Sequence, residues 1–492
     1  MSLARLWAFL AIGLPVLGTL LANLQTVDLA YHLRAGGMIL DTRAIPTVDS
    51  FTFTAAGQPW QDQQWGAQVI LAAVYRLAGW TGLVLLRAAM VGVLFGIVFD
   101  LCRSGHTTRT AALLTLAAFG LGAVTLALRP QLFAMVLFAA TLWLAHRRRE
   151  HPRALWLAVP IAALWANLHG SFFLGPAVLG LAWLGEIVER RSFRDARPLL
   201  EVAVVAAVTT VANPFGIGVW QYVAAISSNS VITSRITEWQ PTLTKFPESV
   251  AFVASCLLIA AILAVRYRRD RRVPAGALVW LLPFAALGLW TVRGLAWWPI
   301  VAAVTVARLT AATDGPAPRE RRDTLTMRRL NAVVAGVLVL AAVALLPFWR
   351  PQGPGLDAPL GVVGTAPPGI TLELRKLATA GDRLFAPQPW GSWFEFALPQ
   401  TPVFIDSRIE LFPVSVWDDY DTIVDGGDGW QQTLDDHGVT IVVAAKPAGT
   451  SQPTDPLADD PRWRQVYADD DGRIFVRADR GSGSLPAGVA RR

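Results

Sequence analysis

Residues 24–65 form a long polar stretch, LQTVDLAYHLRAGGMILDTRAIPTVDSFTFTAAGQPWQDQQW. The stretch follows directly on an apolar segment at 6–24, and it is too polar to cross a bilayer. It is also too rich in acidic and aromatic residues for a simple connection. A long polar stretch of this kind, placed between apolar segments, indicates an outward-facing loop that carries the chemistry of a membrane protein.

The composition supports a membrane protein with many crossings. Of the 492 residues, 53% are hydrophobic and 16% are charged, whereas soluble domains carry about 25% charged residues. The net charge of +7 raises the question of nucleic acid. The arginines, however, lie in short clusters between apolar runs, which is typical of cytoplasmic loops, so we expect no nucleic-acid partner. The two cysteines, Cys102 and Cys256, show no metal-binding spacing.

Apolar runs predict about eleven membrane helices. The expected spans are 6–24, 82–101, 109–127, 130–145, 154–168, 172–188, 198–213, 249–265, 274–291, 296–311 and 330–348. The first is longer than the apolar core of a signal peptide and lacks a clear cleavage site, so we expect it to be retained. Residues 67–80 (AQVILAAVYRLAGW) predict an amphipathic interfacial helix that ends at Gly79. The alternative is the start of a long second membrane helix.

The loops between these spans fall into two sets. One set is strongly basic and covers 103–109, 146–153, 189–197, 266–272 and 314–329. The positive-inside rule places this set in the cytoplasm. The other set covers 28–80, 129–130, 167–171, 213–248, 293–298 and the chain after 350, and it holds nearly all the distinctive polar and aromatic motifs. We therefore expect a multi-pass protein of the inner (plasma) membrane whose site and C-terminal domain are extracytoplasmic.

The expected fold class is a polytopic α-helical membrane protein with a small extracytoplasmic α/β domain. Residues 1–349 form the membrane domain, which includes the outer loop 25–80, and residues 350–370 read as a Gly/Pro linker. The α/β domain spans 371–480, and a disordered tail spans 481–492. RLFA, PVFID, VTIVVAA and RIFVRA predict buried strands, and helices are expected around 372–380, 416–425, 430–437 and 457–467.

The outer loop contains the leading catalytic candidates. Asp28 follows the first helix, and helical spacing places His32 on the same face. An ionised carboxylate at the membrane boundary is suited to take a proton from a hydroxyl group, as a general base. Asp49 is the candidate for a second acid that binds a metal or orients a substrate. The alternative is structural: a helix-end Asp28 beside a satisfied His32, and an Asp49 that holds a turn.

The other outer segments add candidate binding residues. Arg129 and Arg293 lie at outer helix ends, where a planar guanidinium suits a phosphate; snorkelling or a structural ion pair is the alternative. Polar or aromatic contacts to the substrate are expected from Arg34, Trp65, Asn167, His169, Glu238 and Trp239. Helix capping and packing are the alternatives for these residues. In the C-terminal domain, Asp406, Arg408 and Glu410 of FIDSRIEL follow a predicted strand and form a further candidate cluster, for which a surface ion pair is the alternative.

Several motifs resemble a known superfamily. They are D-x-x-x-H-L-x-x-G from Asp28, I-P-x-x-D-S-F-x-F-T from Ile45, R-P-Q from Arg129, W-x-N-x-H-G from Trp165 and E-W-Q-P from Glu238. With the long first outer loop and the C-terminal outer domain, they resemble the GT-C superfamily of integral membrane glycosyltransferases, and more closely a bacterial subgroup of it. Protein mannosyltransferases, oligosaccharyltransferases, aminoarabinose transferases and mycobacterial arabinosyltransferases belong to this superfamily.

The resemblance implies inverting transfer of a sugar from a polyprenyl-phosphate donor to a glycan, lipid or protein acceptor of the cell envelope, with membrane lipids as surroundings. It implies a divalent cation (Mg²⁺ or Mn²⁺) in some members and none in others. The first-loop acid maps onto Asp28 as base. Many members have paired acids there, whereas Asp28 has no adjacent acid, so Asp49 fills the second role or the activity is lost. A non-catalytic membrane scaffold and a transporter of lipid-linked substrates are the competing hypotheses.

Overall fold

The computed structural model describes residues 1–244, 247–311, 323–446 and 454–480. It divides the chain into two compact units: unit 1 comprises residues 1–22 and 84–349, and unit 2 comprises residues 23–83 and 350–492. The expected tail at 481–492 and the 314–322 part of the last basic loop lie outside the described residues. The division differs from the expected domains, because the outer loop belongs with the C-terminal domain.

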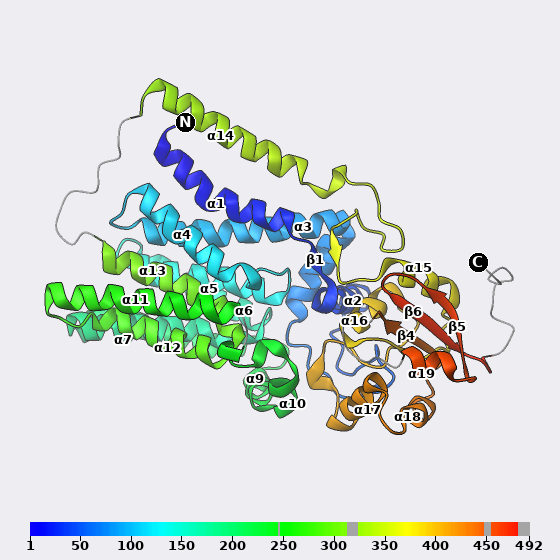
Figure 1. Cartoon of the computed structure of the whole chain (residues 1–492). Helices are drawn as coiled ribbons and strands as arrows, with labels where there is room; N and C mark the ends of the chain where they lie inside the picture. Colours follow the sequence, from blue (N-terminus) through cyan, green and yellow to red (C-terminus); the bar gives the residue numbers. More distant parts are fainter. Residues whose placement is uncertain (245–246, 312–322, 447–453, 481–492) are drawn as a thin grey trace. The chain divides into compact units, whose positions relative to one another are not determined.

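Unit 1 is built from helices (Figure 1). Its α-helices are α1 (Leu3–Leu21), the later part of α3 (Trp65–Arg103), α4 (Thr108–Gly122), α5 (Pro130–Arg147), α6 (Ala158–Ala166), α7 (Leu174–Arg190), α8 (Phe193–Thr209), α9 (Gly218–Ser228), α10 (Ser230–Arg235), α11 (Glu248–Asp270), α12 (Ala275–Trp290), α13 (Trp298–Thr310) and α14 (Leu325–Ala344). Short 3₁₀ turns join them: η1 (Ala123–Thr125), η2 (Pro152–Leu157), η3 (Gly170–Phe173), η4 (Thr237–Trp239), η5 (Thr242–Thr244), η6 (Val292–Ala296) and η7 (Pro347–Trp349).

Each of the eleven expected spans coincides with helical structure, the fifth with η2 and α6 together. Within the described residues, six segments are long and apolar enough to cross a membrane: Leu3–Leu21, Trp65–Arg103, Thr108–Thr125, Gly170–Arg190, Glu248–Asp270 and Leu325–Ala344. Helix α1 packs against α4 and α14, which lie beside it in Figure 1. The predicted polytopic helical fold is confirmed.

Helix α3 is interrupted at Gly79. The backbone of this residue has φ 57° and ψ −152°, which breaks the helix that runs from Trp65 to Arg103. A side chain is strongly disfavoured in that conformation, so glycine is the residue that permits the break. The sequence-based prediction that the first amphipathic helix ends at Gly79 is confirmed.

A buried arginine caps the first helix of unit 1. Arg87 of α3 donates hydrogen bonds to the carbonyl oxygens of Thr19 and Ala22 at the C-terminal end of α1. These carbonyls have no partner within the helix, and a cation is favourable at this end of the helix dipole. A charge in an apolar span therefore has a structural role as a helix cap.

In unit 2, the outer loop is hydrogen-bonded to the C-terminal segment. Strand β1 (Leu24–Gln25) pairs in parallel with β2 (Val363–Gly364), which lies inside the expected linker. Helix α2 (Thr26–Thr42) follows immediately and packs on α16 (Gln388–Ala397). Segment 51–53 also bonds to Val403, through Val403 N to Phe51 O at 3.3 Å and Phe53 N to Val403 O at 3.1 Å. The segment at 350–370 is thus part of the fold of unit 2.

The C-terminal domain has a four-stranded mixed sheet in the order β3-β4-β6-β5. Its strands are β3 (Leu384–Phe385), β4 (Ile441–Ala445), β5 (Trp463–Ala468) and β6 (Gly472–Arg477). Only β3 and β4 are parallel; β6 is antiparallel to both of its neighbours, β4 and β5. The helices are α15 (Pro368–Leu377), α16, α17 (Val414–Asp425), α18 (Trp430–Asp436) and α19 (Thr454–Asp459), beside the turn η8 (Ile409–Leu411).

Two expectations for this domain are corrected. The helix predicted at 457–467 ends at Asp459, and residues from Trp463 form β5. Pro461 cannot continue a helix, and the residues after it pair with β6. The predicted strand PVFID forms only isolated bridges, from Val403 to Leu384 and to Thr52. Pro402 has no N–H to donate, which limits the ladder.

Candidate active site

Asp28 lies in the first turn of α2 and is half-buried. The backbone around it is held from three sides. Thr26 donates two hydrogen bonds: its N–H donates to Thr365 Oγ1 at 3.2 Å, and its hydroxyl donates to Gly364 O at 3.1 Å. The hydroxyl of Ser407 donates to Val27 O at 2.5 Å. Unit 2 therefore fixes the position of the carboxylate at a helix N-terminus, where a negative charge is favoured.

The neighbouring candidates of the outer loop have different surroundings. His32 is buried, one helical turn after Asp28, with its ring 4.0 Å from that of Tyr31. Arg34 donates to Pro399 O at 2.8 Å. Trp65 is half-buried and is the first residue of α3. The structure confirms the helix that places Asp28 and His32 on one face.

Asp49 lies in a buried ion-pair network around Arg408. Its carboxylate accepts hydrogen bonds from the backbone N–H groups of Phe51 and Thr52, and from Arg408 Nη2 at 2.6 Å. The same guanidinium donates to Asp406 through Nε at 2.9 Å. The side chains of Asp49 and Arg408 are at most 1% exposed. The geometry thus gives Asp49 a structural role and does not support Asp49 as a second catalytic acid.

Aromatic rings complete the network. The Arg408 guanidinium lies over the rings of Phe51 and Trp60, at 4.6 and 4.5 Å from their centroids. The alternative of a surface ion pair for FIDSRIEL is wrong in one respect, because Asp406 and Arg408 do pair but are fully buried. A partner from the outer loop and the two rings exclude water from the pair.

Two acids near this network have raised pKa values. Burial raises the pKa of Asp62 to about 7, although Gln68 donates a hydrogen bond to it at 2.6 Å. Burial, followed by the charge of Asp406, raises the pKa of Glu395, while Arg408 opposes that rise. The sequence pattern does not indicate Asp62 or Glu395 as a catalytic residue. Glu395 lies in an aromatic run, WFEF, which is the one signal of its burial.

In unit 1, Arg129 and Arg293 converge on Glu238. Arg129 Nη2 lies 2.5 Å from Glu238 Oε1, and Arg293 Nε lies 3.2 Å from Glu238 Oε2. Burial would raise the pKa of Glu238, but the two arginines outweigh it and lower that pKa. The carboxylate of Glu238 is therefore shared by two arginines.

The cluster lies where several elements end. Arg129 is the N-cap of α5, Glu238 is in η4, and Arg293 is in η6. The Arg293 guanidinium also lies 4.7 Å from the ring centroid of Trp239. The hydroxyl of Thr291 donates to Glu238 O at 3.1 Å and ties η6 to η4. The sequence motifs that contain Arg129, Glu238 and Arg293 are thus brought together.

The W-x-N-x-H-G motif lies close to this cluster. His169 is in the turn between α6 and η3, where its Nδ1 accepts from Ser171 N at 3.1 Å. Burial, followed by the charges of Arg293 and Arg129, lowers the pKa of His169 to about 3. Asn167 donates to Ala163 O at 2.8 Å and to Ala212 O at 2.9 Å, so it links two segments of backbone. His169 is therefore neutral and Asn167 has a structural contact.

No group of three or more His, Cys, Asp or Glu within the described residues is arranged to hold a metal ion. The carboxylate of Asp49, the expected second acid, is engaged by Arg408. These donors do not fit the divalent cation that the resemblance implies for some members. The mechanism proposed below therefore contains no metal-dependent step.

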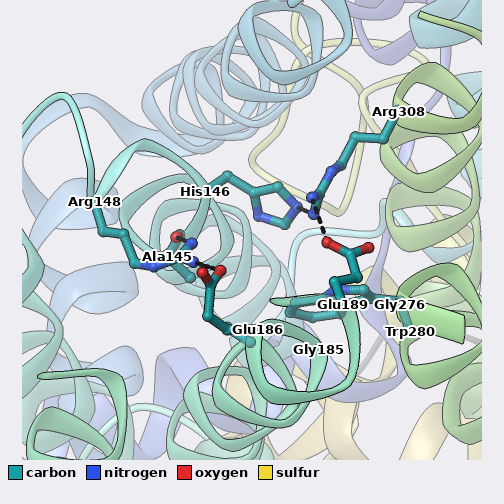
Figure 2. Close-up of a pocket in the computed structure, with 10 residues that line it drawn as sticks. Ala145, His146, Arg148, Gly185, Glu186, Glu189, Gly276, Trp280 and Arg308 are labelled. Carbon is teal, nitrogen blue, oxygen red and sulfur yellow. Dashed lines mark hydrogen bonds and ion pairs between the residues drawn. The ribbon is translucent and has the colours of Figure 1, made fainter. Parts of the chain in front are cut away.

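A polar pocket of unit 1 lies among basic residues that the sequence predicts to be cytoplasmic (Figure 2). Glu186 pairs with Arg148, and Arg308 lies 3.2 Å from His146 Nε2 and 3.9 Å from Glu189. Its cavity of about 20 Å³ is close to the space that one water needs. The pocket is too small for a sugar and reads as an ion-pair network that joins α5, α7 and α13.

Comparisons with known proteins place the fold. No protein-family model matches the chain, and no curated protein sequence matches it. Among solved structures, the chain is similar to the mycobacterial arabinofuranosyltransferase AftD, with a TM-score of 0.56 and 18% identity over 97% of this chain and 42% of that one. It is also similar to ArnT of Cupriavidus metallidurans bound to undecaprenyl phosphate, with a TM-score of 0.53 and 15% identity over 97% and 98% of the two chains.

A third similar structure is the Archaeoglobus fulgidus oligosaccharyltransferase with a tethered acceptor peptide. Its TM-score is 0.53, with 13% identity over 90% of this chain and 68% of that one. All three structures share the GT-C architecture of integral membrane glycosyltransferases. The chain has the GT-C fold, and the resemblance found in its sequence motifs is confirmed at the level of fold.

Proposed function

We propose that the protein is a membrane glycosyltransferase that moves a sugar from a polyprenyl-phosphate donor to an acceptor hydroxyl at the outer face of the plasma membrane. The observation that carries the proposal is the Arg129–Glu238–Arg293 cluster in a GT-C fold. Its two planar guanidinium groups suit a lipid phosphate. The similar ArnT structure holds such a ligand, undecaprenyl phosphate.

The proposed reaction is an inverting transfer. Asp28 takes the proton of the acceptor hydroxyl, and the oxygen forms a bond to the anomeric carbon of the sugar. The bond from that carbon to the donor phosphate oxygen breaks, and polyprenyl phosphate leaves with the electron pair. Arg129 and Arg293 of unit 1 are proposed separately as the groups that bind a lipid phosphate. The acceptor is an envelope glycan, lipid or protein.

The first test replaces Asp28 with Asn in the full chain, reconstituted in vesicles with undecaprenyl phosphate that carries a radiolabelled pentose or hexose and with an envelope extract as acceptor. We expect the transfer rate to fall about 10²–10⁴-fold, because a positioned general base contributes this much. Asp428→Asn, in an exposed loop of unit 2, is the matched control and should retain the wild-type rate. Unchanged transfer by Asp28→Asn would rule out the base assignment.

A binding measurement separates the two roles. Native mass spectrometry with undecaprenyl phosphate should show weaker binding for Arg129→Gln and Arg293→Gln, and wild-type binding for Asp28→Asn. Equal binding by all three variants would contradict the phosphate site. If deletion of the protein leaves envelope glycans unchanged, the scaffold hypothesis gains support. The transporter hypothesis predicts charged residues deep within membrane helices. Arg87 is such a residue, and it caps the end of α1.

A further inference from the structure

Unit 2 contains a cavity whose lining includes none of the residues assigned to the proposed transfer reaction. Its volume is about 460 Å³, within the range of about 300–1,000 Å³ that ligand pockets occupy. It lies between α2, the part of α3 before Gly79, and Phe396 of α16. All of these elements belong to unit 2.

Small residues create the space. A Cβ on Gly36 would lie 2.1 Å from the carbonyl oxygen of Gln68, so α2 and α3 touch through their backbones at this point. The cavity opens beside this contact, where Gly37 and Ala72 line it. A Cβ on Gly37 would have only Arg76 within 4 Å, at 3.6 Å. The contact at Gly36 thus holds α2 and α3 together, and the cavity lies beside this contact.

The walls combine the groups that recognise sugars. Asp41 and Thr42 offer oxygen atoms to hydroxyl groups, and the rings of Tyr75 and Phe396, packed edge to face at 5.5 Å, offer apolar surface. Arg76 donates to Asp41 at 2.8 Å and to Gly37 O at 2.9 Å. Arg76 is therefore already paired, and it holds the Asp41 carboxylate at the cavity.

Arg34 differs from Arg76 in its partners. It donates one hydrogen bond to protein, to Pro399 O at 2.8 Å, and its guanidinium lies 5.5 Å from the ring centroid of Phe51. In the part of the chain that the structure describes, Arg34 forms no ion pair. Burial lowers the pKa of Arg34, and the charge of Glu395 opposes this only in part. A desolvated cation without a counter-ion is costly, so an anion in the cavity would stabilise it.

We propose that this cavity binds an anionic saccharide, a sugar that carries a carboxylate or a phosphate. Arg34 pairs with the anionic group, Asp41 accepts hydrogen bonds from sugar hydroxyls, and Tyr75 and Phe396 contact the apolar face of the ring. If the proposed transferase function holds, such a saccharide is the natural acceptor class, and that extension rests on the proposed function. The binding itself does not depend on it.

The test measures binding to the detergent-purified full chain by saturation-transfer NMR and equilibrium dialysis. The probes are glucuronate and glucose 6-phosphate, with glucose and inorganic phosphate as the partial ligands. We expect at least one anionic sugar to bind more tightly than either partial ligand. Arg34→Gln should weaken its binding at least about tenfold, since a charged hydrogen bond is lost. Arg34→Lys, which keeps the charge but not the fork, should fall between Arg34→Gln and wild type.

Arg464→Gln is the matched control, because Arg464 is an exposed arginine of β5 outside the cavity. It should bind as wild type, and the thermal midpoints of all variants confirm folding. Absence of binding by both anionic sugars, or glucose bound as tightly as they are, would overturn the proposal. Inorganic phosphate bound as tightly as glucose 6-phosphate would instead indicate a lipid headgroup site. Asp28→Asn should bind the anionic sugar normally, so a failed transferase proposal is distinguishable from a failed cavity proposal.

Discussion

At the scale of single residues, the role of an acidic side chain depends on its partners. Asp28 and Asp49 both lie in polar motifs of the outer loop, and both read as catalytic candidates. Asp28 begins a helix and is half-buried, whereas Asp49 pairs with an arginine 359 positions away. The carboxylate of Asp49 is held in the ion pair with Arg408, because breaking this pair would leave a charge buried without a partner.

Arg408 also acts on the pKa values of two neighbouring acids, Asp406 and Glu395. Burial would raise the pKa of Asp406, but the charge of Arg408 outweighs it and lowers that pKa. For Glu395, burial and the charge of Asp406 prevail over Arg408 and raise the pKa. The pKa values of the two neighbouring acids are therefore shifted in opposite directions. The three acids around Arg408 are Asp49 of the outer loop and Glu395 and Asp406 of the C-terminal domain.

Asp62 supplies a prediction on pH. Burial raises its pKa from 3.8 to about 7, so the folded state binds a proton that the unfolded state has released between these values. The contribution of Asp62 to stability is present below about pH 4 and is lost as pH rises towards 7. Asp62→Asn keeps the acceptor for Gln68 but cannot ionise. We expect the thermal midpoint of Asp62→Asn, relative to wild type, to be higher at pH 8 than at pH 5.

Thermal unfolding of the purified chain at the two pH values checks this expectation. Asp428→Asn, an exposed acid, is the control and should show the same difference from wild type at both values. A midpoint difference for Asp62→Asn that is equal at pH 5 and pH 8 would contradict the raised pKa.

At the scale of elements, Gly79 decides where α3 breaks. The amphipathic pattern of 67–80 is compatible with an interfacial helix and with the start of a long span. The backbone of Gly79, at φ 57° and ψ −152°, settles this in favour of a break. A Cβ at this position would have nothing within 4 Å, so conformation alone, and not crowding, demands glycine.

Gly79→Ala should therefore destabilise the chain by about 1–3 kcal/mol, the cost of an unfavourable backbone region for a residue with a side chain. The matched control is Gly180→Ala inside α7, where a Cβ also has nothing within 4 Å. There alanine should be neutral or stabilise by up to about 1 kcal/mol, because it favours the helix. Chemical denaturation in detergent measures both, and equal effects of the two substitutions would refute the role of the break.

At the scale of the whole molecule, the chain builds unit 2 from two distant segments. It leaves unit 1 after Ala22, forms the first part of unit 2, and returns to complete it after residue 349. Strand β1 has β2 as its partner, and the outer loop bonds to Val403 and Arg408. The C-terminal domain is therefore needed to fold the segment that contains Asp28.

A chain truncated after Trp349 tests this dependence. It lacks β2, Ser407 and Arg408, so residues 23–83 lose the partners that order them. Limited proteolysis with mass spectrometry should show rapid cleavage within 23–83 in the truncated chain, and slow cleavage there in the full chain. Cleavage in the exposed turn at residues 149–151 of unit 1, which retains its partners, is the internal control. Equal protection of 23–83 in both chains would show that the outer loop folds alone.

The helices of unit 1 could be predicted from the sequence, because long apolar runs and basic loops are features of local composition. Each expected span coincides with helical structure, and the end of the first amphipathic helix is set by one glycine. The sequence places Arg129, Glu238 and Arg293 in loops that are all predicted to lie on the outer side, which is consistent with their convergence. Their pairing through 2.5 and 3.2 Å contacts required the fold.

The association of distant segments could not be predicted from the sequence. The burial of Asp49 and Arg408, the pairing of β1 with β2, and the cavity around Arg34 all depend on residues more than 300 positions apart or on small gaps between helices. Periodicity and composition describe neighbours along the chain. The long-range ion pairs and short strand pairings that define unit 2 leave little local pattern, so the outer loop of residues 24–65 reads as part of the membrane domain until its partners are seen.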